Sequence, residues 1–185
     1  MPLDMVTPIM RSRAKAVNFG IVYGIGAFSL AKDIGVSNKE AKHYIESYLA
    51  HYSGVDSYMK NVVEKANADG YVETMFGRRR NLPELTSSKH MIRAFGERVA
   101  RNMPIQGTAA DIIKIAMVRV RDRLLRDGLQ SRLILQVHDE LILEAPKDEQ
   151  ETAMCLLTEE MENAFRMDAP LVAEAKAGHS WYDAK

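Results

Sequence analysis

The fold is decided by one stretch of sequence, Arg132-Leu-Ile-Leu-Gln-Val-His-Asp-Glu-Leu-Ile-Leu-Glu144. Two short apolar runs flank a polar His-Asp-Glu triplet, a pattern typical of two strands joined by a turn. We expect strands at 132–137 and 141–144, with Pro146 ending the second because proline cannot donate a ladder hydrogen bond. The stretch therefore predicts an antiparallel hairpin within residues 132–145.

Upstream of this hairpin the hydrophobic period is helical. Thr7-Pro8 is a helix start, Ser37 and Glu40 form a capping box, and Pro104 should end the helix before it. We expect helices over 8–23, 28–34, 37–51, 53–70, 87–102 and 107–126, with a small hairpin or basic loop at 71–82. Downstream, a helix over 148–166 and a last strand over 171–177 complete an α+β fold.

Composition excludes several classes of protein. The 185 residues are 46% hydrophobic and 27% charged, which is globular rather than disordered or collagen-like. No apolar run approaches the roughly 18 residues of a membrane span, so we expect no membrane partner. The single cysteine, Cys155, excludes a disulfide framework and indicates a reducing, cytoplasmic location. Cys155 falls on the apolar face of its helix, where we expect it to be in the core.

The net charge of zero hides an asymmetry. Residues 1–126 hold 20 Lys and Arg against 12 Asp and Glu, whereas residues 127–185 hold 5 against 13. The two parts therefore carry net charges of +8 and −8. A basic front can indicate a polyanionic partner, or its charges can be spread over surface salt bridges.

The first candidate site is one face of the helix over 8–23. Arg11, Lys15, Phe19 and Tyr23 recur every fourth residue, so they share a face. Two cations near a helix N-terminus followed by two aromatic rings suit the phosphates, sugar and base of a nucleoside triphosphate. An amphipathic helix that carries two cations by coincidence gives the same spacing.

The second candidate site is the turn of the hairpin. Asp139 and Glu140 adjoin apolar strands, where an unpaired charge is costly, and a divalent cation would relieve that cost. A structural turn also commonly contains Asp, so this alternative remains open. Asn102 and Gln106 are either polar groups at a helix end or readers of the acceptor-rich minor groove.

Three segments together resemble DNA polymerase family A. Residues 11–24 match R-x3-K-x3-F-G-x2-Y-G (motif B of that family), and residues 136–140 match Q-V-H-D-E (motif C). Residues 97–111 resemble the stretch E-R-x3-N-x2-[IVM]-Q-G-[ST]-A-A-D, and the terminal Trp181-Tyr-Asp-Ala-Lys185 also resembles the family's C-terminus. The match covers about residues 3–185.

The resemblance implies a fold and a set of site residues. Residues 1–100 would be a helical fingers subdomain, with the motif B helix at 8–23, and residues 101–185 part of an antiparallel-sheet palm. By position, the implied catalytic residues are Asp139, Glu140 and Lys15, with Asp139 as a ligand of catalytic Mg²⁺. The nucleotide-binding residues would be Arg11, Lys15, Phe19 and Tyr23. The residues implied to contact primer-template DNA are Tyr23, Gly24, Arg93, Arg98, Asn102, Gln106 and His138.

One part of the family pattern is missing from these residues. The other palm carboxylate of the family lies in a D-Y-S-Q-I-E-L-R motif before motif B, and no such motif occurs here. Two-metal chemistry requires both anchors, so we expect an incomplete Mg²⁺ site and no polymerase activity from these residues alone. We expect Met1 to start a gene fragment and the N-terminal part of the polymerase to be a partner, besides DNA and dNTP. A binding module without catalysis, or self-association through exposed palm surface, is the alternative.

Overall fold

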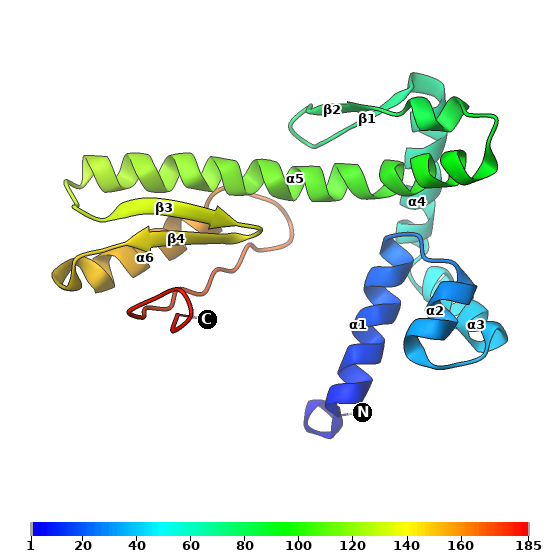
Figure 1. Ribbon diagram of the computed structural model, residues 1–185, viewed down its shortest axis with the longest axis horizontal. Coiled ribbons are helices and arrows are strands. Elements are labelled where there is room, and N and C mark those ends of the chain that lie inside the picture. The colour runs from blue at the N-terminus through cyan, green and yellow to red at the C-terminus, as the bar shows by residue number, and fades with distance from the viewer. Residues whose placement is uncertain (1, 185) are drawn as a thin grey trace. The chain divides into compact units, whose positions relative to one another are not determined.

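The structure is a computed structural model that describes residues 2–184. The chain divides into two compact units, Met1–Gln106 and Gly107–Lys185. Helix α5 (His90–Arg126) belongs to both units (Figure 1). Among the described residues, no helix combines the length and apolar character needed to cross a membrane.

The first unit is mainly helical. Its elements are η1 (Leu3–Met5), α1 (Pro8–Val22), α2 (Ala27–Ile34), α3 (Asn38–His51), α4 (Ser53–Asp69), β1 (Tyr71–Glu73), β2 (Arg79–Asn81), η2 (Pro83–Thr86) and the start of α5. Strands β1 and β2 pair antiparallel, so the hairpin expected at 71–82 is confirmed. The Arg79 guanidinium lies 4.4 Å from the Tyr71 ring centroid and 3.2 Å from Glu73, which ties the two strands together.

Local sequence signals determine where the first helices begin. Thr7 caps α1 through a 3.2 Å hydrogen bond that its hydroxyl accepts from the Met10 amide. Ser37 and Glu40 form the predicted capping box: the Ser37 hydroxyl accepts from the Glu40 amide (3.2 Å), and Glu40 accepts from the Ser37 amide (2.9 Å). The Ser37 hydroxyl also donates to the Glu40 carboxylate (2.7 Å). This hydrogen bond is the main cause that lowers the pKa of Glu40, followed by the bond from the Ser37 amide.

Two apolar clusters hold the first unit together. Leu30, Ala31 and Ile34 of α2 pack with Ala41 of α3. The second cluster joins α4, the small hairpin, η2 and α5 through Ala66, Val72, Leu82, Leu85 and Ala100. Helix α5 therefore contributes to the core of this unit.

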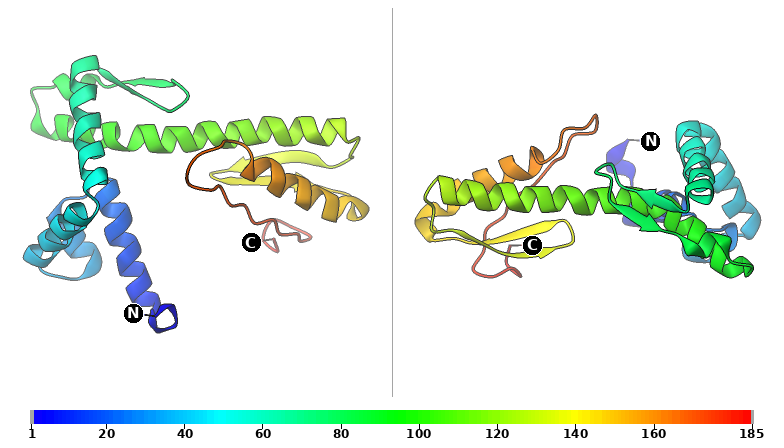
Figure 2. Two further views of the ribbon diagram at one scale, coloured as in Figure 1. Left: turned by 180° about the vertical axis from the view of Figure 1, so that it is seen from behind. Right: turned by 90° about the horizontal axis from the view of Figure 1, so that it is seen from above.

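The second unit is a hairpin packed against helices. It contains the rest of α5, β3 (Arg132–Val137), β4 (Glu140–Glu144), η3 (Lys147–Glu149) and α6 (Gln150–Glu162). Figure 2 shows α6 crossing one face of the β3–β4 hairpin. Its core is made of Ala116, Val120, Leu124, Leu141, Leu156 and Ala164. Both units together give the predicted α+β class.

The Glu149 carboxylate holds the start of β3. It accepts hydrogen bonds from the Gln130 amide (2.8 Å), the Ser131 amide (2.8 Å) and the Ser131 hydroxyl (2.6 Å). These donors, the Gln130 amide first, lower the pKa of Glu149 because they stabilise its charged form. The turn after α5 is therefore fixed by a contact 18 or 19 residues away.

Four sequence expectations about the elements and the core are wrong. Pro104 does not end a helix, because α5 runs continuously from His90 to Arg126 with Pro104 inside it. No strand is assigned over 171–177 in the described part of the chain, since no described strand pairs with that segment. Cys155 is exposed rather than in the core, and α6 spans Gln150–Glu162, shorter than the expected 148–166.

Burial on both sides explains why α5 continues through Pro104. A proline inside a helix removes one hydrogen bond and costs about 3 kcal/mol. Ala100 and Met103 pack in the cluster of the first unit, and Ala116 packs in that of the second. Apolar burial of about 0.8 kcal/mol per methylene group, repeated along the helix, offsets that cost.

Candidate functional site

The exposed face of α1 brings together the four residues expected from their spacing. Arg11, Lys15, Phe19 and Tyr23 are all exposed. The Lys15 Nζ atom lies 5.8 Å from the Phe19 ring centroid, within the range of a cation–π interaction. The Phe19 and Tyr23 rings stack with centroids 6.1 Å apart and an interplanar angle of 25°. The face is a cation followed by two stacked rings.

Burial separates this face from the rest of α1. Phe19 is 46% and Tyr23 38% exposed, whereas Ile21 on the other side of the helix is 3% exposed. Large aromatic side chains usually bury most of their surface, so two stacked rings left open at the end of one helix form a platform for another flat group. Tyr23 is the C-cap residue of α1, which places its ring at the helix end.

Gly24, directly after this helix, lies against α5. Its φ of +76° is in the left-handed region, where a glycine has no steric penalty. A Cβ atom added at this position would lie 3.3 Å from Arg101 Nη1 and 3.7 Å from Arg98 Cγ. The turn after α1 therefore meets α5 where two arginines lie, within the first unit.

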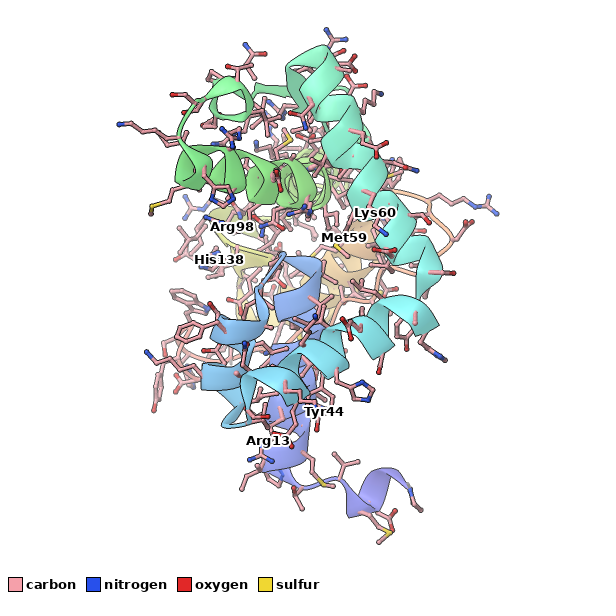
Figure 3. All side chains as sticks on the ribbon, turned by 90° about the vertical axis from the view of Figure 1, so that its right-hand side faces the viewer. Arg13, Tyr44, Met59, Lys60, Arg98 and His138 are labelled. Atoms are coloured by element: carbon pink, nitrogen blue, oxygen red, sulfur yellow. The ribbon has the colours of Figure 1, made fainter. Side chains whose placement is uncertain are left out.

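The candidate DNA-contacting residues on α5 follow a four-residue spacing. Arg98, Asn102 and Gln106 share one helix face. The exposed Arg98 extends from α5 in the first unit (Figure 3), with its guanidinium carbon 5.9 Å from the Phe95 ring centroid. Gln106 is exposed, whereas the Asn102 Oδ1 atom is buried and has no hydrogen-bond partner among the described residues.

Arg93, another candidate for DNA contact, has a local structural role. Its Nη1 atom donates to the Ser87 carbonyl (2.8 Å) and to the Ser88 carbonyl (3.1 Å), at the chain segment that leads into α5. The guanidinium therefore fixes the start of this helix. The remaining donors of its five-donor fork are the ones that a ligand could use.

The β3–β4 turn has an uncommon backbone conformation. Val137 pairs with Glu140, so His138 and Asp139 form a two-residue turn. His138 has φ +52°, and it is the one non-glycine residue with positive φ in the described chain. The Gln136 side-chain amide donates to the His138 carbonyl (2.7 Å) and supports the turn. Such strained residues concentrate at functional sites.

The two acids near this turn are not buried, although the sequence predicted that burial would make their charges costly. Asp139 and Glu140 are both exposed at the turn end of the hairpin. Their charges are therefore solvated without a cation, and the burial argument for a metal is wrong. Glu140 Oε2 accepts a 3.2 Å hydrogen bond from Trp181 Nε1. The Asp139 carboxylate makes no hydrogen bond or ion pair within residues 2–184.

The residues present supply part of the ligand set of a divalent-cation site. An unpaired, exposed carboxylate such as Asp139 is the hard oxygen ligand that Mg²⁺ prefers. No group of three or more His, Cys, Asp or Glu side chains in the described part of the chain could hold a metal ion. The second unit therefore offers one carboxylate ligand and not a complete set.

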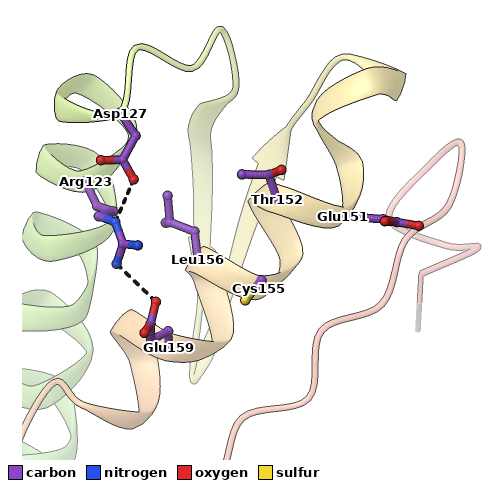
Figure 4. Close-up of a pocket in the computed structure, with 7 residues that line it drawn as sticks. All are labelled: Arg123, Asp127, Glu151, Thr152, Cys155, Leu156 and Glu159. Atoms are coloured by element: carbon purple, nitrogen blue, oxygen red, sulfur yellow. Dashed lines mark hydrogen bonds and ion pairs between the residues drawn. The ribbon is translucent and has the colours of Figure 1, made fainter.

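A pocket in the second unit has a structural explanation. Figure 4 shows Arg123 of α5 between Asp127, directly after this helix, and Glu159 of α6, at 2.7 Å and 3.1 Å. The guanidinium also pairs with Glu160 of α6 at 3.0 Å. The Arg123 hydrogen bond is the main cause that lowers the pKa of Asp127, and the three acids raise the pKa of Arg123. Because the cation is fully paired, this pocket does not suit a phosphate.

Sequence reasoning missed two features of these sites. The contact of Gly24 with Arg101 joins segments 77 residues apart, and no local pattern predicts it. The Trp181–Glu140 hydrogen bond spans 41 residues. The one available signal was that Trp181 is the chain's single tryptophan and lies in the segment matched to the family's C-terminus.

The family model for DNA polymerase family A matches residues 1–183. The chain therefore belongs to DNA polymerase family A, as its motifs indicate. Among curated proteins it is 53% identical to DNA polymerase I of Bacillus caldotenax over 98% of this chain, and 52% identical to DNA polymerase I of Bacillus subtilis. In each case the matched region covers 21% of the relative, so the chain spans about a fifth of their length.

A solved structure gives the same result for the fold. The chain is similar to the POL domain of Pol1 from M. smegmatis, determined in complex with DNA primer-template and dNTP. The TM-score is 0.94 with 46% sequence identity, covering 100% of this chain and 32% of that one. At this identity the likeness supports common ancestry as well as a common fold.

Proposed function

We propose that these residues are the fingers and an incomplete palm of a template-directed DNA polymerase. The observation that carries the proposal is the open face of α1, where Lys15 lies 5.8 Å from the Phe19 ring and Phe19 stacks with Tyr23. Arg11 and Lys15 would hold the triphosphate of an incoming dNTP, with Lys15 counted among the catalytic groups. Phe19 would pack on its sugar and base, and Tyr23 would lie by the templating base.

Primer-template DNA is the second proposed ligand. Arg98 and Gln106 are exposed on one face of α5, and Gly24 leaves the adjoining turn free of a side chain. Exposed cations suit phosphates, and an amide with donors and acceptors suits the minor-groove edge. Arg93, Asn102 and His138 complete the proposed contact set, His138 next to the primer end.

Asp139 is the proposed Mg²⁺ ligand of this chain, with Glu140 as an auxiliary acid beside it. When bound, the divalent cations of such a site activate the primer 3′-hydroxyl and stabilise the leaving pyrophosphate. One carboxylate turn cannot anchor two cations, so residues 1–185 by themselves are proposed to lack polymerase activity. The missing anchor belongs to the remaining four-fifths of the polymerase, which is proposed as the natural partner of this part.

Two measurements on the purified chain test this proposal. Titration with a dNTP should show binding that Lys15→Met weakens by about 10- to 100-fold, because a charge-assisted phosphate contact is worth about 1.5–3 kcal/mol. Lys42→Met is the matched control, since Lys42 is an exposed cation on α3. Primer extension by the wild-type chain should be no higher than primer extension by the Asp139→Ala variant. Extension that Asp139→Ala abolishes would contradict the proposed inactivity, and equal dNTP binding by both lysine variants would contradict the nucleotide site.

One observation favours an additional property, self-association. Ile134 is 58% and Leu135 46% exposed on β3, and the pairing register with β4 shifts between Leu133 and Leu135. Exposed apolar strand residues attract a second copy. The molar mass by light scattering should rise with concentration, and Ile134→Lys should keep the chain monomeric. A constant monomer mass excludes this property.

A further inference from the structure

Residues 180–184 form a closed turn. The Ser180 carbonyl accepts hydrogen bonds from the Asp183 amide (3.1 Å) and the Ala184 amide (3.2 Å). The Ser180 hydroxyl also lies 2.7 Å from Asp183 Oδ2, to which it donates. Three hydrogen bonds within five residues give this short segment a defined shape.

Gly178 allows the turn to fold back on the preceding chain. A Cβ atom added at Gly178 would lie 2.7 Å from Asp183 Cβ and 2.9 Å from the Ala184 nitrogen. Both distances are shorter than real Cβ contacts, and the atoms met are backbone or close to it. The turn therefore requires glycine at this position.

The Trp181 side chain of this turn contacts the β3–β4 hairpin. Trp181 Nε1 donates to Glu140 Oε2 at 3.2 Å, which joins the C-terminal turn (red in Figure 1) to the first residue of β4. The adjacent Asp139 has no comparable partner in the described chain. Of two neighbouring carboxylates, one is held and the other is free.

We propose that Trp181 is a positioning residue that holds Glu140 on the C-terminal turn, leaving Asp139 as the carboxylate that the hairpin offers to a divalent cation. This rests on the proposed function, because the cation is the one a polymerase would bind. An indole N–H can only donate, so Trp181 does not compete with the carboxylates as a metal ligand. The hydrogen bond occupies Oε2 and orients the Glu140 carboxylate, so the proposal is that Glu140 has to turn away from Trp181 to join Asp139 on a cation.

The first experiment tests the contact itself. Because the 185-residue chain has one tryptophan, its indole N–H gives a single side-chain resonance in a nitrogen–proton correlation spectrum. Glu140→Ala should make this proton exchange with water about three- to tenfold faster, as expected for losing a hydrogen bond of ordinary net strength. Glu144→Ala, at the other end of β4, is the control and should leave exchange unchanged. Equal exchange in all three chains would overturn the proposal.

The second experiment tests positioning with Mn²⁺ as the probe, its free concentration read by electron paramagnetic resonance. Trp181→Phe should bind Mn²⁺ about three- to tenfold more tightly, because Glu140 is released to join Asp139. Adding Glu140→Ala should remove this gain, and adding Asp139→Asn should remove binding at the turn. Tyr182→Phe is the matched control on the same turn. Unchanged or weaker Mn²⁺ binding in Trp181→Phe, or a gain that survives Glu140→Ala, would overturn the proposal.

Gly178→Ala provides an independent variant that keeps the indole. It should move the turn away from the hairpin and raise Mn²⁺ affinity in the same direction as Trp181→Phe, with the circular dichroism of the helices retained. Neither experiment contains nucleotide or DNA. A chain that fails to bind dNTP while passing both tests would contradict the proposed function and leave the role of Trp181 intact.

Discussion

Arg101 of α5 lies against Gly24 at the end of α1, so that a Cβ atom on the glycine would be 3.3 Å from Arg101 Nη1. Arg101 is also paired with Glu97 at 3.4 Å, which limits its freedom to move aside. The close approach holds the end of α1, the helix that carries the proposed nucleotide face, against α5. Two separate restraints, backbone conformation and space, therefore act on one residue.

Gly24→Ala is predicted to destabilise the chain more than Gly35→Ala does. Both glycines have positive φ, +76° and +69°, so each alanine costs about 1–2 kcal/mol of backbone strain. No atom lies within 4 Å of an added Cβ at Gly35, so that variant lacks the steric contribution. Urea unfolding should give a larger loss of unfolding free energy for Gly24→Ala. Equal losses would show that Arg101 moves aside without cost.

Ser37→Ala is predicted to destabilise the first unit by about 1 kcal/mol. The substitution removes the hydroxyl that caps α3 and donates to Glu40 at 2.7 Å. Ser47→Ala, an exposed position inside the same helix, is the control and should be neutral or slightly stabilising. Thermal or urea unfolding followed by circular dichroism measures both. A Ser37→Ala chain as stable as Ser47→Ala would disprove the capping contribution.

Arg123→Met is predicted to destabilise the second unit in a pH-dependent way. The pKa of Asp127 is below its ordinary value of 3.8, mainly through the Arg123 hydrogen bond. A lowered acid pKa stabilises the fold fully above the unfolded value, and this stabilisation is lost as pH falls through the folded pKa. The difference in unfolding free energy between wild type and variant should therefore shrink below about pH 4.

The control for this prediction is Arg121→Met. Arg121 is on the same helix but is 68% exposed and pairs with one acid, Asp122, whereas Arg123 is 27% exposed and pairs with three. Urea midpoints at pH 7 and pH 3 compare the two variants. A pH-independent difference for Arg123→Met would mean that its alkyl packing, and not its charge, stabilises the helices.

Arg98→Ala is predicted to weaken primer-template binding and to reduce its salt dependence. Loss of one phosphate contact should make the slope of log K against log salt less negative by about 0.9. Lys42→Ala, which removes one exposed charge from α3, should leave the slope unchanged. Binding isotherms at several salt concentrations provide the slopes. The same slope change in both variants would indicate that the total charge of the chain matters, and not a contact between Arg98 and a DNA phosphate.

Much of the candidate site followed from local spacing. Arg11, Lys15, Phe19 and Tyr23 share a face because helix geometry brings every fourth residue together, and the hairpin over 132–144 formed where alternation and turn residues indicated. What local spacing could not supply was exposure: Asp139 and Glu140 lie open to solvent, and Cys155 does too. Exposure depends on which elements pack over a residue, and this is not encoded in its neighbours along the chain.

The sequence by itself determined the helix starts at Thr7 and Ser37, the hairpin over 132–144 and the family, because each depends on residues close in sequence. Tertiary structure alone decided the rest. Helix α5 continues through Pro104 because apolar burial on both sides outweighs a lost hydrogen bond, and 171–177 is not a strand because a strand needs a paired backbone. Trp181 meets Glu140 only because the folded chain brings residues 41 apart to hydrogen-bond distance.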